Sequence, residues 1–297
     1  MKFRAGFVAI VGEPNVGKST LLNALLNFKL SIVSPKPQTT RHKILGILTG
    51  EDYQAIFLDT PGIISPRYTL QEFMQREVSS AIDDADVIVL MVEPEERINR
   101  KVVDRFLERF KRVPVLLTIN KIDKVKEKER LLPLIDEYSK YGFKEVYPIS
   151  ALYRNGLEDL REGIVKSLPE GEPFYPPDQL TDKPERFFVA ELIREQIFTC
   201  YGEEIPYSTS VEVEEFVERP QKKDYIRAVI YVEKPSQKPI IIGRRGEALK
   251  RVGERARKEI ETFLGRKVYL ELWVKVYKGW RREKGFIRER IYSGQKS

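Results

Sequence analysis

The chain has 297 residues, of which 41% are hydrophobic and 33% are charged. This length and composition predict two domains with hydrophobic cores, and they exclude a disordered chain. The single cysteine, Cys200, excludes a disulfide framework and a cysteine-rich zinc site, and we expect it to be a small buried side chain. The sole histidine, His42, leaves little scope for a histidine-based metal site or triad.

The formal net charge of +7 is concentrated at one end of the chain. Residues 1–180 hold 26 basic and 26 acidic side chains, so this part is neutral. Residues 181–218 hold 3 basic and 10 acidic side chains, whereas residues 219–297 hold 23 and 9. An excess confined to one region is typical of a surface that binds a polyanion. The alternative is a solvated basic face that has no partner.

The first predicted strand is the apolar run at 7–11, and it leads directly into the sequence GEPNVGKST. This sequence matches G-x-x-x-x-G-K-[ST], and a predicted helix at about 18–28 completes the context of a phosphate-binding loop. Backbone N–H groups of such a loop face phosphate oxygens, the lysine reaches the outer phosphates, and the serine can hold Mg²⁺. The predicted nucleotide-binding residues here are Gly12, Glu13, Pro14, Asn15, Val16, Gly17, Lys18, Ser19 and Thr20.

The start of the chain superficially resembles a signal peptide. Its apolar part runs straight into the phosphate loop, so cleavage after it would destroy that site. No apolar stretch approaches the ~20 residues that a membrane-spanning helix needs. We therefore expect an intracellular, cytoplasmic protein.

Three further predicted strands also end in polar motifs. The run at 55–58 is followed by Asp59, Thr60, Pro61 and Gly62; the run at 115–119 by Asn120, Lys121, Ile122 and Asp123; and the run at 146–149 by Ser150 and Ala151. Open α/β sheets bind ligands outside the carboxyl ends of their strands, so these motifs and the phosphate loop should cluster.

Each motif has a chemical role in nucleotide recognition. Asp59 can hold Mg²⁺ through water, and the Gly62 N–H can face a γ-phosphate. The Asp123 carboxylate can accept hydrogen bonds from the N1–H and exocyclic amine of guanine, a donor pair that adenine lacks. Ser150 and Ala151 can offer a backbone N–H to the guanine oxygen. The order of the four motifs predicts a guanine-nucleotide site.

With these motifs, residues 1–168 resemble the translation-factor-like GTPases of the Ras-type fold, an α/β fold with a doubly wound, mostly parallel sheet. The resemblance implies GTP and GDP as ligands, Mg²⁺ as cofactor and GTP hydrolysis as activity. It implies catalytic roles for Lys18, Thr40, Asp59 and Gly62, with Mg²⁺ held by Ser19, Thr40 and Asp59. Thr39 is the alternative to Thr40 in the segment PQTTRH at 37–42.

One departure from the Ras pattern concerns hydrolysis. Ras-like enzymes have a glutamine shortly after Gly62 that orients the attacking water, whereas this chain has Ile63, Ile64, Ser65 and Pro66. Ile63 resembles the apolar residue found here in a large branch of bacterial GTPases, so we expect slow intrinsic hydrolysis. Asn15 has two interpretations: it helps to coordinate an activating K⁺, as in potassium-activated relatives, or it tolerates a tight turn.

The remaining elements up to residue 168 alternate between strand and helix. Strands are predicted at 43–49, 51–58 and 87–92, and helices at about 69–83, 98–111, 126–141 and 157–167. Four prolines within residues 168–178 then predict a stiff, extended connector, and we take 169–185 as the linker. We expect Phe174 and Tyr175 to pack across the domain junction.

The second half resembles a bacterial-type (type II) KH domain over residues 186–280, followed by a basic tail at 281–297. The predicted order is α-β-β-α-α-β, with a helix at 186–201, strands at 207–213 and 224–233, a short helix before the loop at 243–246, a helix at 251–264 and a strand at 268–274. A G-x-x-G loop that follows three isoleucines at 240–242 separates the two later helices; such loops clamp the backbone of about four single-stranded nucleotides. The predicted RNA-binding residues are Ile242, Gly243, Arg244, Arg245, Gly246, Lys250, Arg281 and Arg282.

The whole chain closely resembles the Era family of bacterial ribosome-associated GTPases. The family implies binding to the 3′ end of 16S rRNA and a role in assembling the small (30S) ribosomal subunit, and we expect a monomer. One alternative is a passive RNA-binding protein whose nucleotide site is structural. Another is a GTPase recruited by its basic end to the inner face of the cell membrane as a weak peripheral protein.

Overall fold

The computed structural model describes residues 2–94, 113–126 and 131–292. The chain forms two compact units. The first consists of Met1–Ser31, Thr40–Ser65 and Met74–Asp182, and the second of Ile32–Thr39, Pro66–Phe73 and Lys183–Ser297. Two short segments from the first part of the sequence therefore belong to the second unit.

The first unit is built on a mostly parallel sheet in the order β2-β3-β1-β4-β5-β6. Its strands are β1 (Arg4–Gly12), β2 (Ile44–Thr49), β3 (Tyr53–Asp59), β4 (Val87–Val92), β5 (Val115–Ile119) and β6 (Glu145–Pro148). All neighbours are parallel except β2, which runs antiparallel to β3. The doubly wound Ras-type sheet that the sequence predicts is thus confirmed.

The described helices of the chain's first part are α1 (Lys18–Leu26), α2 (Thr69–Asp83), α4 (Leu131–Ser139) and α5 (Leu157–Ser167). Apolar residues of α2 and α4 pack on one sheet face with Ala9, Ile56 and Leu90. Side chains alternate along a strand, so residues such as Val8 and Ile10 are buried on the opposite face. The predicted helix at 98–111 and residues 127–130 of the predicted helix at 126–141 lie outside the described residues.

The proline-rich segment bends at Phe174 and Tyr175 and contacts other residues of the first unit. Gln54 holds it in place, because its side-chain oxygen accepts from the N–H groups of Phe174 (2.7 Å) and Tyr175 (3.0 Å). Phe174 packs against Phe7 with 5.2 Å between ring centroids, and Tyr175 packs against the core of this unit. The two rings that we expected at the domain junction are therefore placed on the first unit.

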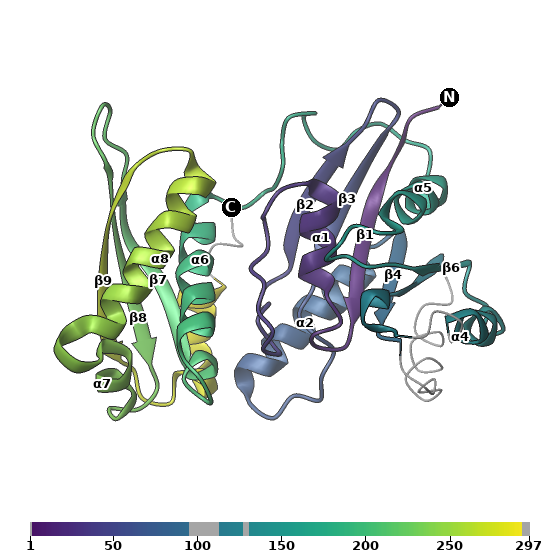
Figure 1. Cartoon of the computed structure of the whole chain (residues 1–297). Helices are drawn as coiled ribbons and strands as arrows, with labels where there is room; N and C mark the ends of the chain where they lie inside the picture. Colours follow the sequence, from purple (N-terminus) through teal and green to yellow (C-terminus); the bar gives the residue numbers. More distant parts are fainter. Residues whose placement is uncertain (1, 95–112, 127–130, 293–297) are drawn as a thin grey trace. The chain divides into compact units, whose positions relative to one another are not determined.

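The second unit contains the element order α-β-β-α-α-β that the sequence predicts. Its main elements are α6 (Glu185–Cys200), β7 (Thr209–Val217), β8 (Asp224–Val232), α7 (Gln237–Ile242), α8 (Glu247–Leu264) and β9 (Val268–Val276). The sheet has the order β7-β8-β9, with β7 antiparallel and β9 parallel to β8. Figure 1 shows α6 and α8 side by side on one face of this sheet.

The core of the second unit lies between those two helices and the sheet. Val252, Ala256 and Ile260 recur every four residues along α8, so they form one buried helix face. Cys200, which we expected to be buried, is exposed at the last residue of α6, so that expectation was wrong. Among the described residues, no helix combines the length and apolarity needed to cross a membrane.

The two short segments are bound to the second unit by several contacts. The Val33 N–H donates to Glu195 of α6 (2.9 Å). The Lys36 ammonium donates to the carbonyls of Phe198 and Tyr201, where α6 ends, and a cation is favourable at that end of a helix. In the other segment, the Thr69 hydroxyl donates to the Arg282 carbonyl (3.1 Å).

Candidate nucleotide site and nucleic-acid interface

The phosphate loop follows β1 and leads directly into α1. Gly17 precedes the helix with φ of 101°, and a Cβ at this position would lie 2.3 Å from the Asn120 side-chain nitrogen. Only glycine fits here. Asn120 is buried, and it donates to the Val16 carbonyl (2.7 Å) and accepts from the Ala151 N–H (2.9 Å). One side chain thus connects three of the predicted motifs.

Lys18 lies inside the loop with only 6% of its surface exposed. Its ammonium donates to the carbonyls of Gly12 (3.1 Å) and Glu13 (2.8 Å). Burial lowers the pKa of Lys18 to about 8, although the charges of Asp59 and Glu13 oppose this shift. The cation is therefore desolvated and held by weak neutral acceptors, at a place where phosphate oxygens would be much better partners.

The three predicted metal-binding side chains lie together. Asp59 is fully buried, and its Oδ2 accepts from the Ser19 hydroxyl (2.7 Å), which lies 2.8 Å from the Thr40 hydroxyl. Asp59 Oδ1 has no hydrogen-bond partner among the described residues. Burial raises the pKa of Asp59, with Ser19 and Lys18 opposing. A buried carboxylate oxygen beside two hydroxyls is a donor set that fits Mg²⁺, which prefers oxygen ligands.

Thr39, the alternative to Thr40, is oriented differently. Its hydroxyl donates to the Lys36 carbonyl within the same turn (2.8 Å). Of the two threonines, Thr40 is the one whose hydroxyl contacts Ser19.

The predicted guanine-binding residues come from the ends of β5 and β6. Asp123 is exposed, and its Oδ1 accepts from the Ser150 hydroxyl (2.5 Å), which orients the carboxylate. Lys121 has φ of 66°, and its ammonium forms an ion pair with Glu93. Glu93 is not among the predicted residues, and its only signal in the sequence is its position directly after β4.

The segment after Gly62 returns to the phosphate loop. The Ile63 N–H donates to the Gly12 carbonyl (3.1 Å), and Gln75 of α2 donates to the Gly62 carbonyl (3.0 Å). The amide of Gln75 is therefore engaged with the backbone. Asn15 is exposed with φ of 67°, a conformation that asparagine tolerates better than most residues. This turn explains Asn15 by itself, so the K⁺ interpretation stays a prediction.

The G-x-x-G loop of the second unit joins α7 to α8. Gly243 has φ of 74°, and a Cβ there would lie 2.5 Å from the Ala248 Cβ. Arg245 is also left-handed, with φ of 52°. Arg244 and Arg245 are exposed. The loop therefore presents two guanidinium groups beside a backbone that a phosphate can approach closely.

A groove of about 430 Å³ begins at this loop and runs between α8 and β9. Its lining combines apolar and basic side chains. They include Leu249, Leu270, Leu272, Lys223, Lys250 and Arg257. Of its lining, only Gly246 and Lys250 were predicted. Arg281, also predicted, instead pairs with Glu233 and lies over the Tyr68 ring at 5.1 Å, and its neighbour Arg282 accepts from Thr69 through its carbonyl.

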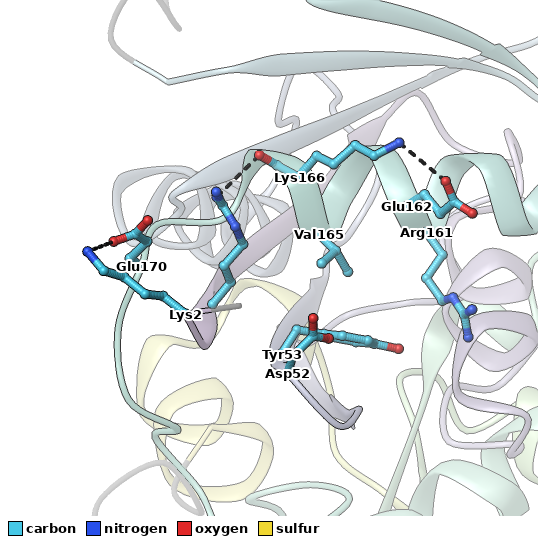
Figure 2. A pocket seen from close by; sticks show the side chains of 9 residues that line it. Lys2, Asp52, Tyr53, Arg161, Glu162, Val165, Lys166 and Glu170 are labelled. Atoms are coloured by element: carbon cyan, nitrogen blue, oxygen red, sulfur yellow. Dashed lines mark hydrogen bonds and ion pairs between the residues drawn. The ribbon is translucent and has the colours of Figure 1, made fainter.

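A second hollow, of about 470 Å³, lies beside α5 near the amino ends of β1 and β3 (Figure 2). Four of its charged side chains form two ion pairs. Lys2 contacts Glu170 (2.9 Å) and Lys166 contacts Glu162 (3.2 Å). None of the predicted site residues lines it, and we assign it no function.

Comparison with known proteins agrees with this geometry. Residues 7–121 match a family model described as "50S ribosome-binding GTPase", and residues 204–281 match a KH domain model. GTPase Era of Lactobacillus helveticus is 48% identical over 291 residues, which is 97% of this chain and 96% of the relative. GTPase Era of Caldanaerobacter subterraneus subsp. tengcongensis is 49% identical over 298 residues, 99% of each chain.

Two solved structures each have a TM-score of 0.93 and cover 98% of this chain and 99% of their own. One is a point variant of Aquifex aeolicus Era bound to GDP and AlF₄⁻, with 44% identity. The other is Era in complex with MgGDPNP and nucleotides 1506–1542 of 16S ribosomal RNA, with 43% identity. With its GTPase motifs, its KH domain and these nearly full-length matches, the chain belongs to the Era family of GTPases.

Proposed function

We propose that this cytoplasmic, monomeric protein binds GTP with Mg²⁺, hydrolyses it to GDP and phosphate, and binds the 3′ end of 16S rRNA in assembly of the 30S subunit. The buried Asp59 oxygen beside Ser19 and Thr40 carries the nucleotide part of this proposal. The RNA part rests on the groove and on the relative that holds both MgGDPNP and 16S rRNA.

The chain's own residues account for nucleotide binding. Lys18 would exchange its carbonyl acceptors for β- and γ-phosphate oxygens, and Asp123, oriented by Ser150, would accept from guanine. Ser19 and Thr40 would hold Mg²⁺ directly, and Asp59 would hold it through water. When bound, Mg²⁺ supplies neutralisation of the charge that develops on the phosphate oxygens.

Hydrolysis is expected to be slow without an activator, because Ile63 stands where Ras-like enzymes have glutamine. The proposal includes K⁺ as an activating cation beside Asn15, where its charge would act as an arginine finger does. Turnover would then be faster in K⁺ than in Na⁺, and Asn15→Gly would lose the difference. Glycine is chosen for the variant because it tolerates the same positive φ and keeps the turn. Equal hydrolysis rates of the parent protein in K⁺ and Na⁺ would remove K⁺ from the proposal.

The nucleotide state would be coupled to RNA binding through the two short segments of the second unit. Thr40 directly follows the segment at 32–39, in which Val33 and Lys36 are bonded to α6. The segment at 66–73 follows Gly62 by a few residues. A rearrangement of Thr40 or Gly62 around a γ-phosphate would therefore displace the adjoining residues of these segments, which belong to the unit with the RNA groove.

The identity of the RNA is tested by ultraviolet crosslinking in cells and sequencing of the bound RNA. We expect the sequencing reads to map to the 3′ end of 16S rRNA. These reads should be lost in the double variant Arg244→Asp/Arg245→Asp, which changes two exposed side chains. Reads from the large-subunit rRNA, to which the description "50S ribosome-binding" points, would contradict the small-subunit assignment. Turnover of GTP excludes the passive RNA-binding alternative, and liposome flotation that survives RNase treatment would favour membrane recruitment.

A further inference from the structure

Three aromatic side chains lie on the sheet face of the second unit that points away from α6 and α8. Ile226, Val268 and Val274 are in the core, and alternation along a strand places their neighbours on the other face. These neighbours include Tyr225, Tyr269 and Trp273, which we call the aromatic face. Tyr269 is 57% exposed and Trp273 is 52% exposed, so large parts of both side chains contact solvent.

The aromatic face is held in place by its neighbours. The rings of Tyr225 and Tyr269 stack with centroids 6.0 Å apart and 15° between planes. Glu271 lies between the aromatic residues, and it accepts from the Tyr225 hydroxyl (2.5 Å) and the Trp273 indole N–H (2.8 Å). The side chains are therefore ordered before any ligand arrives, which lowers the entropic cost of binding.

The charges around the aromatic face favour a polyanion at one end. The hairpin between β7 and β8 carries Arg219, which lies 5.1 Å from the Tyr225 ring centroid, and the exposed Lys222 and Lys223. Neither lysine forms an ion pair with another described residue. The three glutamates of β7 each form an ion pair: Glu214 with Lys275 (2.8 Å), Glu215 with Arg227 (3.4 Å) and Glu212 with Arg290.

The aromatic face is continuous with the groove of the KH domain. Tyr269 and Lys223 line that groove, and Tyr269 also stacks on Tyr225. Trp273 lies four residues further along the same strand edge. A strand that leaves the groove past Tyr269 therefore meets basic side chains for its phosphates and then an exposed indole for a base.

We propose that the aromatic face is a second RNA site, which stacks unpaired bases of the strand whose neighbouring nucleotides occupy the groove. Base stacking on aromatic side chains tolerates any base, and one stacked base is worth ~5- to 150-fold in affinity. This inference rests on RNA binding by the groove, and it adds a longer footprint to that function.

The test measures affinity against RNA length with the full chain. The probes are nested single-stranded RNAs from the 3′ end of 16S rRNA. The shortest has about four nucleotides, which is the number that a KH groove holds. For the parent, affinity should keep rising with length beyond the groove. For Trp273→Ala, which leaves the groove lining intact, the rise should stop there, with ~5- to 150-fold weaker binding of the longer probes. Trp273→Phe keeps an aromatic ring and should behave like the parent.

Tryptophan fluorescence gives an independent measurement. The chain has two tryptophans, and Trp280 is fully buried. Quenching by a longer probe, absent with the shortest one and absent in Trp273→Phe, would report stacking on Trp273. If the alanine variant follows the parent at every length and no quenching occurs, the proposal is wrong and this face is left for a protein partner. If the groove does not bind RNA, Arg244→Asp/Arg245→Asp would bind even the shortest probe as the parent does. This outcome distinguishes a wrong assignment of the groove from a wrong assignment of the aromatic face.

Discussion

The nucleotide site and the RNA groove of this protein are made from different kinds of residue. The atoms that would contact phosphate and Mg²⁺ belong to backbone groups and to side chains that are buried, as in Lys18 and Asp59, or half-buried, as in Ser19. The groove is lined by partly exposed residues of α8 and β9, and its charges sit on exposed arginines and lysines. In the first site the side chains are held by hydrogen bonds inside the unit, whereas the second site is a surface.

This difference determines how each site should respond to change. Removing one buried group leaves its partners desolvated and unpaired, which costs far more than the loss of one surface contact. A long RNA also divides its binding energy among many contacts, each of which is screened by salt. Single substitutions should therefore abolish nucleotide binding, while RNA binding should weaken by steps.

The largest effect is expected for Lys18→Ala. It removes a buried cation from the phosphates, which costs about 3–5 kcal/mol or ~200- to 5,000-fold in GTP affinity. RNA binding measured without nucleotide should not change. Lys140→Ala, at the exposed residue directly after α4, is the control, and equilibrium titration with a fluorescent GTP analogue is the measurement. An RNA affinity that fell in parallel with GTP affinity would contradict the separation of the two sites.

Asp123→Asn should change which nucleotide is bound. The carboxylate would accept two hydrogen bonds from guanine, and their loss costs about 3 kcal/mol or ~100-fold in affinity. The variant should bind xanthosine triphosphate more tightly than the parent protein does, because the base of this nucleotide offers an acceptor where guanine has the amine. Asp136→Asn, an exposed substitution of the same kind on α4, should leave both affinities unchanged. Equal losses for the two nucleotides would mean that Asp123 does not contact the base.

The same contrast explains how much the sequence could predict. Gly17 must be glycine because Asn120 approaches it, and Asn120 in turn holds Val16 and Ala151. Constraints of this kind fix residue types at set spacings, so nearly the whole nucleotide site is visible as motifs. Glu93 and Gln75 were missed, since an ion pair to Lys121 and a hydrogen bond to the Gly62 carbonyl impose no spacing.

The groove could be predicted only at its loop and at Lys250 of α8. Gly243 requires a positive φ and a close approach to Ala248, and this leaves a motif. Leu249 and Leu272 are ordinary residues of an amphipathic helix and a strand, and nothing in their local sequence says that their elements flank a groove. Cys200 shows the same limit: the end of α6 was predicted within one residue, but the direction of its side chain depends on tertiary packing.

Arg244→Asp/Arg245→Asp should weaken RNA binding across all sequences. Each lost phosphate contact on a single strand also flattens the dependence of log K on log[salt] by ~0.7, so two contacts should flatten it by ~1.4. GTP affinity measured without RNA should stay the same. Lys140→Asp/Lys144→Asp makes the same charge change on the other unit and serves as control. An unchanged salt slope for RNA from the 3′ end of 16S rRNA would show that these arginines do not contact phosphates.

The smallest predicted effect is the pH dependence of ligand affinity. It distinguishes the two sites because a buried lysine serves the nucleotide and exposed arginines serve the RNA. The pKa of Lys18 is lowered to about 8 by burial, so near pH 8 about half of the free protein lacks this charge. Bound phosphates raise the pKa again, and nucleotide binding must then take up ~0.5 proton at pH 8. GTP affinity should fall about tenfold from pH 7 to 9, whereas RNA affinity should stay flat because arginines keep their charge throughout this range.

Asp59, whose pKa is raised, acts in the opposite sense, since Mg²⁺ binding releases its proton at low pH. Calorimetry in buffers of different ionisation enthalpy counts the protons, and Lys18→Arg should show no uptake. A flat GTP affinity without proton uptake would mean that the carbonyls of Gly12 and Glu13 suffice to keep Lys18 charged in the free protein.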